Sequence, residues 1–290
     1  MAKKDETEGE MGAASAGTGA KVAQLAWENR GTIAKVCSTL RRWLRKSNQG
    51  EIVILGLGGT GKDTLAKVLI SDGIPVTLPL SDYKESSDVE NYELKRPKAS
   101  PVKIVTLPGQ KHRRASTWPQ FLRRISAGEI RGVILMNCYG YHSIGNANIK
   151  SMKQWKGRRD RFLKAYLDDR RTEELNLLSE LVPALKSCGK KFWMLNVTCK
   201  QDLWWKEKDA VYSHYREGEF RRKLDELMGP KDPLNMRIEQ VFCSLTISSF
   251  RTGTDEVLQP NAAGYDLQTH GESIRRLIEV LEGVRRWEAR

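Results

Sequence analysis

The chain has 290 residues, which is enough for one large α/β domain with extensions or for two small domains, and we expect one domain. Its formal net charge of +13 favours anionic partners: nucleic acid, an anionic membrane surface or an acidic face of another protein. The five cysteines lie far apart and form no group with zinc-binding spacing, which predicts a reducing, cytoplasmic environment. No apolar run approaches the roughly 20 residues that cross a bilayer. We therefore expect no transmembrane segment, and peripheral association with a membrane stays open.

Two segments precede the predicted main domain. Residues 1–20 are rich in Gly, Ala, Glu and Lys without a hydrophobic period, which predicts a disordered tail. Residues 21–48 are predicted to form an amphipathic helical extension, because apolar residues recur there at helical spacing: Val22, Leu25, Ile33, Val36, Leu40 and Leu44. The basic end of this extension carries Trp43 and suits a membrane surface or an acidic partner, although docking on the chain's own domain is the simpler interpretation. Residues 49–290 are the predicted main domain.

An apolar strand followed by a glycine-rich turn, EIVILGLGGTGKDT, occupies residues 51–64. Glycines let successive backbone N–H groups converge on phosphate oxygens, and the lysine and helix that follow add positive charge and a helix dipole. The run fits the phosphate-binding pattern GxxxxGK, except that the Ser or Thr expected next is Asp63 and a threonine follows one residue late. The predicted nucleotide-binding residues here are Gly56, Gly58, Gly59, Thr60, Gly61, Lys62, Asp63 and Thr64. A plain strand-to-helix turn is the alternative.

Strand-like and helix-like segments alternate beyond this loop, which predicts a doubly wound α/β fold. The sheet should be six-stranded and mostly parallel, with helices on both faces. We expect strands at 51–57, 91–96, 102–107, 132–137, 191–197 and 239–245, the second antiparallel to the third. We expect helices at 62–70, 118–126, 172–188, 219–228 and 272–287, the last with a capping box formed by Thr269 and Glu272.

Three further motifs fall at the ends of predicted strands. Gly109 and Gln110 follow the third strand, and Lys200 and Asp202 follow the fifth. Ser244 ends the sixth strand. Ligands of open α/β sheets bind at this carboxyl edge, where a lysine stem can cover a purine ring and a carboxylate can accept hydrogen bonds from guanine N1–H and N2–H.

In this order the motifs resemble those of small GTPases of the Ras and Arf type. The DxxGQ turn of the family is similar to TLPGQ at 106–110, and its NKxD motif is similar to CKQD at 199–202. Trp118 stands where Arf-like proteins carry a tryptophan. The resemblance implies a P-loop GTPase-like domain that binds GTP or GDP with Mg²⁺, hydrolyses GTP slowly and acts as a switch for an effector or regulator protein.

The resemblance also implies roles at the γ-phosphate. Lys62 would place charge on the phosphates, and Gln110 would orient the attacking water, since catalysis in this family is mainly positioning and charge stabilisation. Arg113 and Arg114 follow closely and could add positive charge there. The interpretation we favour for these two arginines is contact with solvent or with a partner.

Three positions depart from the family. Asp63 replaces the hydroxyl residue that ligates magnesium, and Thr106 replaces the aspartate that holds a magnesium-bound water. Cys199 replaces the asparagine of the NKxD motif, which binds the base in this family and is called the base-reading motif below. The family also has a threonine that closes over magnesium, for which Thr77 and Ser81 are the candidates. A hard cation requires oxygen ligands, but it does not matter which strand supplies them. The carboxylate and the hydroxyl could therefore have exchanged places, and Asp63 and Thr106 are the predicted metal-site residues. Loss of the metal site is the competing interpretation.

Two other functions stay open on the sequence. A degenerate GTPase fold could serve as a nucleotide-independent scaffold, or the chain could be a P-loop kinase of small molecules, against which the base-reading motif argues. A basic insertion near 141–171, with interleaved aromatic residues, could bind nucleic acid or an acidic partner. A helix with a solvated basic face is the interpretation we favour for it.

Overall fold

The computed structural model describes residues 51–70, 88–96, 99–130, 132–143, 149–229, 235–245, 250–251, 257–258 and 265–288. The predicted tail and helical extension at 1–48 lie outside the described residues, as do Thr77 and Ser81. No helix of the described part is long and apolar enough to cross a membrane.

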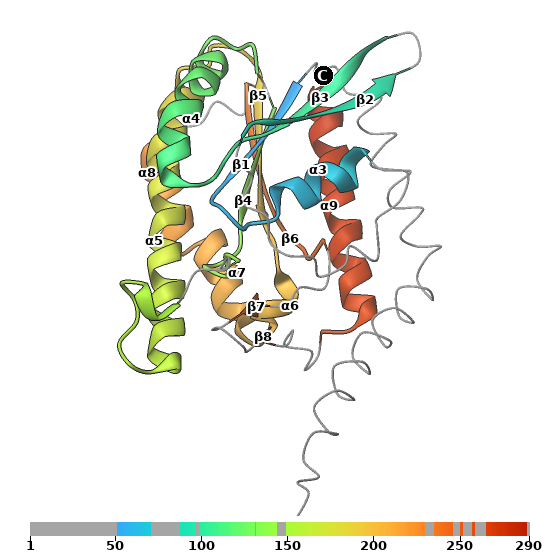
Figure 1. Cartoon of the computed structure of the whole chain (residues 1–290). Helices are drawn as coiled ribbons and strands as arrows, with labels where there is room; N and C mark the ends of the chain where they lie inside the picture. Colours follow the sequence, from blue (N-terminus) through green and yellow to red (C-terminus); the bar gives the residue numbers. More distant parts are fainter. Residues whose placement is uncertain are drawn as a thin grey trace, which may run out of the picture.

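A six-stranded sheet forms the centre of the molecule (Figure 1). Its strands are β1 (Glu51–Gly56), β2 (Glu90–Arg96), β3 (Ala99–Thr106), β4 (Gly132–Asn137), β5 (Phe192–Thr198) and β6 (Met236–Phe242). They lie in the order β2-β3-β1-β4-β5-β6, and every neighbouring pair is parallel except β2 with β3. The predicted fold class, a doubly wound and mostly parallel six-stranded sheet, is confirmed.

The central strands are apolar for most of their length because both of their faces are covered. The buried polar residues Asn137, Asn196 and Thr198 lie toward their carboxyl ends. Every residue of β4 and of β5 is buried, and β1 is buried after Glu51. A parallel sheet enclosed by helices requires such continuous apolar runs instead of alternation. Ile52 and Ile54 face one core cluster, whereas Val53 and Leu55 face the other. This two-sided burial fixes the register of the strands and therefore the position of the loops at their carboxyl ends.

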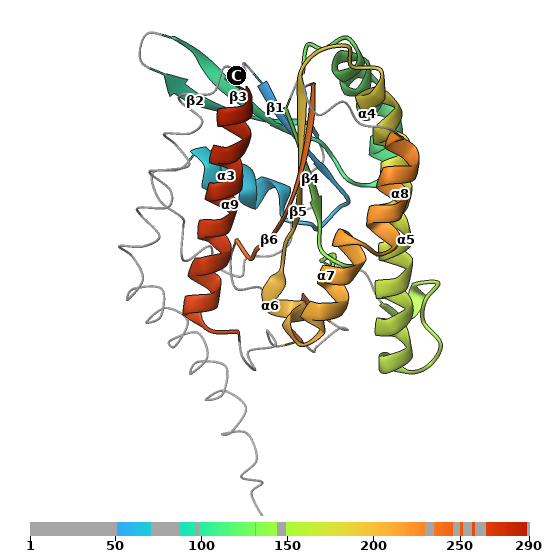
Figure 2. The ribbon, with the colours of Figure 1, turned by 180° about the vertical axis from the view of Figure 1, so that it is seen from behind.

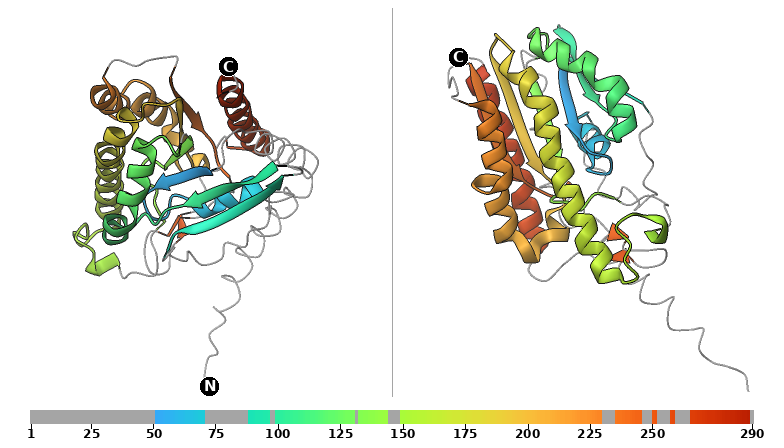
Figure 3. Two further views of the ribbon diagram at one scale, coloured as in Figure 1. Left: turned by 90° about the horizontal axis from the view of Figure 1, so that it is seen from above. Right: turned by 90° about the vertical axis from the view of Figure 1, so that its left-hand side faces the viewer.

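Helices cover both faces, which gives three layers. Helices α3 (Lys62–Ile70) and α9 (Leu267–Glu288) cover one face (Figure 1). Helices α4 (Lys111–Ser126), α5 (Arg159–Lys186), α7 (Lys208–Arg216) and α8 (Glu219–Met228) cover the other, as the reverse view in Figure 2 also shows. Figure 3 shows α5 and α8 side by side along this second face.

Short elements complete the described part of the chain. Helix α6 (Gln201–Trp204) and the 3-10 helix η2 (Trp205–Glu207) follow β5 directly, and a second 3-10 helix, η1, covers Ile149–Ser151. A separate two-stranded sheet pairs β7 (Phe250–Arg251) with β8 (Val257–Leu258). The sequence analysis predicted none of α6, α7, β7 and β8.

Two helices are longer than predicted. Helix α4 begins at Lys111, well before the predicted start at 118, and Pro119 lies inside the helix instead of in its first turn. Helix α5 begins at Arg159, so the second part of the predicted basic insertion, residues 159–171, is the first half of this helix. Phe162 and Tyr166 are buried on its core side. The solvated-face interpretation of this segment therefore agrees with the structure.

The beginning of α9 and the position of β6 also differ from prediction. The side chain of Asp266 accepts a hydrogen bond from the Thr269 amide at 2.7 Å, so Asp266 provides the cap and the predicted capping box is wrong. Strand β6 ends at Phe242, which leaves Cys243 and Ser244 in the loop that follows.

Candidate nucleotide site

The phosphate-binding loop joins the end of β1 to the beginning of α3. Gly56, Gly59 and Gly61 have positive φ angles of 148°, 76° and 92°, so the loop uses conformations that L side chains rarely adopt. Gly58 lies between them in the same turn, and Thr64 is half-buried in the first turn of α3. The glycine-rich sequence therefore produces an irregular turn that ends at a helix N-terminus, the geometry that binds anions in proteins.

Lys62 and Thr60 bind the backbone of this loop. The Lys62 Nζ atom donates a hydrogen bond to the Leu57 carbonyl at 3.0 Å, and the Thr60 hydroxyl donates to the same carbonyl at 3.0 Å. Lys62 is almost completely buried, and this burial lowers its pKa from 10.5 to about 8. The ammonium thus lies across the loop with few hydrogen bonds, and phosphate oxygens would offer it better acceptors.

Gly109 brings the turn after β3 against the phosphate-binding loop. A Cβ atom at this position would lie 2.3 Å from the Gly58 nitrogen and 2.6 Å from the Gly56 carbonyl oxygen. Only glycine permits such an approach between two backbones. The turn that carries Gln110 is therefore fixed directly beside the loop that carries Lys62.

Asp63 and Thr106 lie in direct contact. The Thr106 hydroxyl donates a hydrogen bond to the Asp63 Oδ1 atom at 2.9 Å. Asp63 is in the first turn of α3, and Thr106 is the last residue of β3, so the contact joins the phosphate-binding loop to the neighbouring strand end. The two residues that stand in exchanged places relative to the family thus bring a carboxylate and a hydroxyl together at one point.

Gln110 immediately precedes helix α4. Its backbone carbonyl accepts hydrogen bonds from the amides of Arg113 and Arg114, while its side-chain Oε1 atom is buried without a hydrogen-bond partner among the described residues. Trp118 is the tryptophan that the chain shares with Arf-like proteins. Its indole nitrogen donates a hydrogen bond to the Pro108 carbonyl at 3.1 Å, which fixes the turn against α4. The Gln110 Oε1 atom can therefore still accept a hydrogen bond from a ligand or a water molecule.

Arg114 was expected to contact solvent or a partner, but its side chain is buried. Its guanidinium lies over the Trp118 ring, and one of its nitrogens lies 3.6 Å from Glu180 of α5. The side chain therefore contacts the helical layer, and the expectation of contact with solvent or a partner is wrong for this residue.

The base-reading motif is connected to the phosphate-binding loop by its first two residues. The Cys199 thiol contacts the Thr60 carbonyl at 2.9 Å and the Asn137 carbonyl at 3.0 Å. Lys200 adopts a left-handed conformation with φ of 58°, and its Nζ atom donates to the Tyr141 carbonyl and to the Ser143 hydroxyl at 2.8 and 2.9 Å. A thiol that contacts the loop can brace it in place of the asparagine that the family carries there.

Asp202 and Ser244 bind each other. The Asp202 amide donates to the Ser244 hydroxyl at 3.0 Å, and this hydroxyl donates in turn to the Asp202 carboxylate. Both residues are fully buried at the carboxyl ends of β5 and β6. The structure therefore places the two predicted base-binding residues in one hydrogen-bonded unit.

The loop after β4 was not predicted as part of the site. Its residues Tyr141 and Ser143 accept the hydrogen bonds of Lys200, and the Ser143 amide donates to the Gly59 carbonyl at 3.2 Å. A parallel strand between β1 and β5 must end at the same edge as they do, and this topology was the signal that could have identified the loop.

No protein-family model matches the chain, and no curated protein matches it in sequence. The chain is similar to the signal recognition particle receptor SRb of Chaetomium thermophilum in its GTP/SRX complex, with 13% identity, a TM-score of 0.39 and coverage of 69% of this chain and 92% of that chain. For SRb-GDP of the same organism the identity is 12%, the TM-score 0.37 and the coverage 69% and 90%. For the small COPII coat GTPase SAR1 of Encephalitozoon cuniculi in complex with GDP, the identity is 12%, the TM-score 0.35 and the coverage 99% and 100%. Of these proteins, SAR1 is named as a small GTPase, and the two SRb structures are named as bound to GTP and to GDP.

Proposed function

We propose that the protein is a guanine-nucleotide-binding switch that hydrolyses GTP slowly with Mg²⁺ and so controls a protein partner. The observation that carries this proposal is the contact between the base-reading motif and the phosphate-binding loop, from the Cys199 thiol to the Thr60 carbonyl. A nucleotide must be bound at its base and at its phosphates together. This contact fixes the distance between the groups that would bind each end.

The residues for each part of the nucleotide follow from their positions. The backbone amides of the phosphate-binding loop and Lys62 would bind the phosphates. The Lys200 stem would cover the guanine ring, and the Asp202 carboxylate would accept its N1–H and N2–H. Because the Ser244 hydroxyl orients this carboxylate, the selection of guanine over adenine is a property of the buried pair.

Asp63 and Thr106 fit a magnesium ion. Both supply oxygen donors, which Mg²⁺ prefers, and they lie within hydrogen-bonding distance of each other beside Lys62. Asp63 would hold the ion, and Thr106 would orient a water molecule bound to it. When bound, the ion neutralises charge on the phosphates during phosphoryl transfer.

A protein partner agrees with the structure better than nucleic acid does. Three arginines, Arg158 just before α5 and Arg170 and Arg171 within it, form ion pairs with Asp160, Glu173 and Asp168, respectively. Paired arginines leave fewer free charges for a phosphate backbone. Cytoplasmic placement, with peripheral association at an anionic membrane through the basic extension at 21–48, stays part of the proposal.

A nucleotide-independent scaffold is the second candidate, and one observation favours it. Lys62, Thr106 and Asp202 already have hydrogen-bond partners within the chain, so these three side chains need no ligand to be satisfied. The test is to denature the freshly purified full chain and to identify the released nucleotide by chromatography. Guanine nucleotide near one equivalent supports the switch, and adenine nucleotide contradicts it. Absence of nucleotide, together with no binding of added GTP, supports the scaffold.

A further inference from the structure

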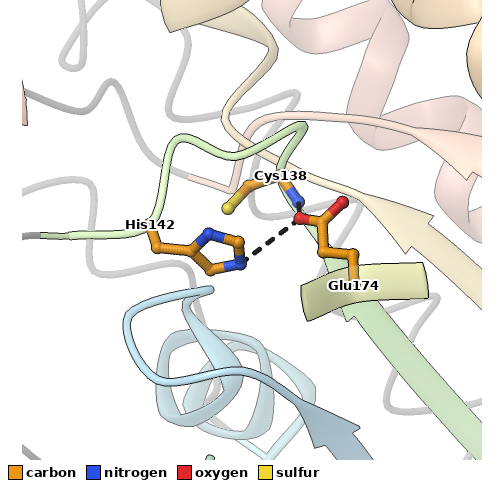
Figure 4. Close-up of side chains that lie close together, drawn as sticks. All are labelled: Cys138, His142 and Glu174. Atoms are coloured by element: carbon orange, nitrogen blue, oxygen red, sulfur yellow. Dashed lines mark hydrogen bonds and ion pairs between the residues drawn. The ribbon is translucent and has the colours of Figure 1, made fainter. Parts of the chain in front are cut away.

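Three side chains that can bind a metal ion converge behind the phosphate-binding loop (Figure 4). Cys138 follows β4, His142 lies in the same loop, and Glu174 projects from α5. Their donor atoms all lie within 4.8 Å of one another, and all three residues are buried. Figure 4 shows the Cys138 thiol, the His142 imidazole and the Glu174 carboxylate close together, with a dashed line from the ring to the carboxylate.

The imidazole of His142 lacks the partners that a buried histidine usually has. Its Nε2 atom lies 3.3 Å from Glu174 Oε1, and its Nδ1 atom has no hydrogen-bond partner among the described residues. The side chain is 1% exposed, so water cannot replace the missing partner from the surface. The Nδ1 atom is therefore available to a metal ion, for which imidazole is a common ligand in proteins.

Glu174 is held as an oriented carboxylate. Its Oε1 atom accepts from the Cys138 amide at 2.9 Å, and its Oε2 atom accepts from the Tyr215 hydroxyl. Burial alone would raise the pKa of Glu174, but its contacts with His142, the Cys138 amide and Tyr215 hold that pKa below its usual value. Hydrogen bonds of this kind orient metal-binding carboxylates and their partners in proteins.

We propose that Cys138, His142 and Glu174 bind a zinc-class divalent cation. A mixed set of sulfur, nitrogen and oxygen donors suits Zn²⁺ and does not suit Mg²⁺, which requires oxygen. In a tetrahedral zinc site, bond lengths of about 2.0–2.3 Å separate the ligand atoms by about 3.3–3.8 Å, so small side-chain movements would close the site. The bound ion displaces the Cys138 thiol proton to solvent, and the resulting thiolate and the Glu174 carboxylate balance its double charge.

The Cys199 thiol lies next to this site. It contacts the Thr60 carbonyl of the phosphate-binding loop and contributes to the raised pKa of the buried Cys138 thiol. The same loop that carries Cys138 and His142 contacts Gly59 through the Ser143 amide, and a Cβ atom at Gly59 would lie 2.6 Å from that amide. The ion would therefore fix the position of the loop that supports both halves of the nucleotide site. Its binding does not depend on the proposed function, because its ligands are separate from the nucleotide-binding residues.

The first test measures metal in the full chain. After purification without chelator, mass spectrometry of the metals should find close to one equivalent of zinc. After removal of metal, added Co²⁺ should produce a thiolate-to-cobalt charge-transfer band. Zinc far below one equivalent with no uptake on titration, or a cobalt spectrum without this band, would overturn the proposal.

The second test assigns the ligands. Cys138→Ser and His142→Gln should each weaken zinc binding by at least about tenfold. The matched control is Cys243→Ser, because Cys243 is equally buried after β6, two strands away from β4 in the sheet, and is no member of the cluster. Equal weakening in the control, or unchanged binding in both ligand variants, would contradict the assignment. If a ligand variant does not fold, the cobalt spectrum of the parent decides.

Discussion

At the scale of single residues, the contact between Thr106 and Asp63 is the most informative departure from the family. Two substitutions that look unrelated along the sequence produce one hydrogen bond of 2.9 Å between a hydroxyl and a carboxylate. Residues that lose their function independently need not stay in contact. We propose that the two groups have exchanged places, and their contact is the observation that supports this over loss of the metal site.

A double-mutant cycle tests this exchange. Asp63→Ala should remove most of the magnesium dependence of GTP binding. The variant with Asp63→Thr and Thr106→Asp should retain more of it than either single change, with a coupling of about 1 kcal/mol or more. GTP affinity is measured by calorimetry with Mg²⁺ and with excess chelator. Equal affinity of the parent protein under both conditions, or strict additivity of the two changes, would contradict the exchange.

Lys62 makes GTP binding depend on pH. Its pKa in the free protein is about 8 because it is buried, so above pH 8 the free lysine loses the charge that attracts phosphate, whereas a bound phosphate would keep it protonated. GTP affinity should therefore be constant below about pH 7.5 and should fall above pH 8 by up to about tenfold per pH unit. Calorimetric titrations between pH 7 and 9 measure this. Lys62→Ala, as the control, should bind weakly without this fall, and a flat profile in the parent protein would exclude Lys62 as a phosphate ligand.

Gln110 should act on hydrolysis and not on binding. Its buried side-chain carbonyl has no hydrogen-bond partner among the described residues, so it is free to orient a water molecule at the γ-phosphate. Gln110→Leu should slow single-turnover phosphate release by at least about tenfold and leave GTP affinity within about twofold. Gln154→Leu is a control, because Gln154 also has a buried Oε1 atom without a hydrogen-bond partner among the described residues and binds Asp169 away from the phosphate-binding loop. Unchanged release from Gln110→Leu would reject the role.

At the scale of elements, the buried strands and the most amphipathic helices could be predicted closely. Strand β4 and helices α3 and α8 have the predicted bounds, because their apolar periods are uninterrupted. The first half of α5 could not be recognised as a helix from the sequence, because charged residues outnumber the few aromatic residues that pack against the core. Helix α4 was shortened in the prediction because Pro119 resembles a helix start, yet the helix tolerates it inside.

Helix α6 contains Asp202, the residue proposed to select guanine. It begins after Lys200, in left-handed conformation, and this turn directs the next residues toward Ser244. Asp202→Asn should weaken GTP binding by about 1.5–3 kcal/mol, which is tenfold or more, and should improve binding of xanthosine triphosphate, because the amide donates where xanthine offers a carbonyl. Competition with a fluorescent nucleotide measures both affinities. The assignment fails if the ratio of the two affinities is the same in the variant and the parent.

At the scale of the whole molecule, the alternation of elements was sufficient to predict the sheet and the edge at which the motifs meet. Contacts across that edge could not be predicted, because they depend on how loops from different strands lie against each other. One such contact is that of the Cys199 thiol with the Thr60 carbonyl. Another is the grouping of Cys138, His142 and Glu174. Linear spacing separates Glu174 from the other two by a whole helical segment, so no metal-binding motif was visible.

The most direct test of the central claim is a calorimetric titration of the full chain, freed of nucleotide, with GTP and with ATP in the presence of Mg²⁺. In the proposed site, the buried pair of Asp202 and Ser244 would select guanine, and the predicted phosphate-binding loop would bind the phosphates. The expected result is one site that binds GTP at least about tenfold more tightly than ATP. Equal affinity for the two nucleotides, or no heat from either, would contradict a guanine-nucleotide switch.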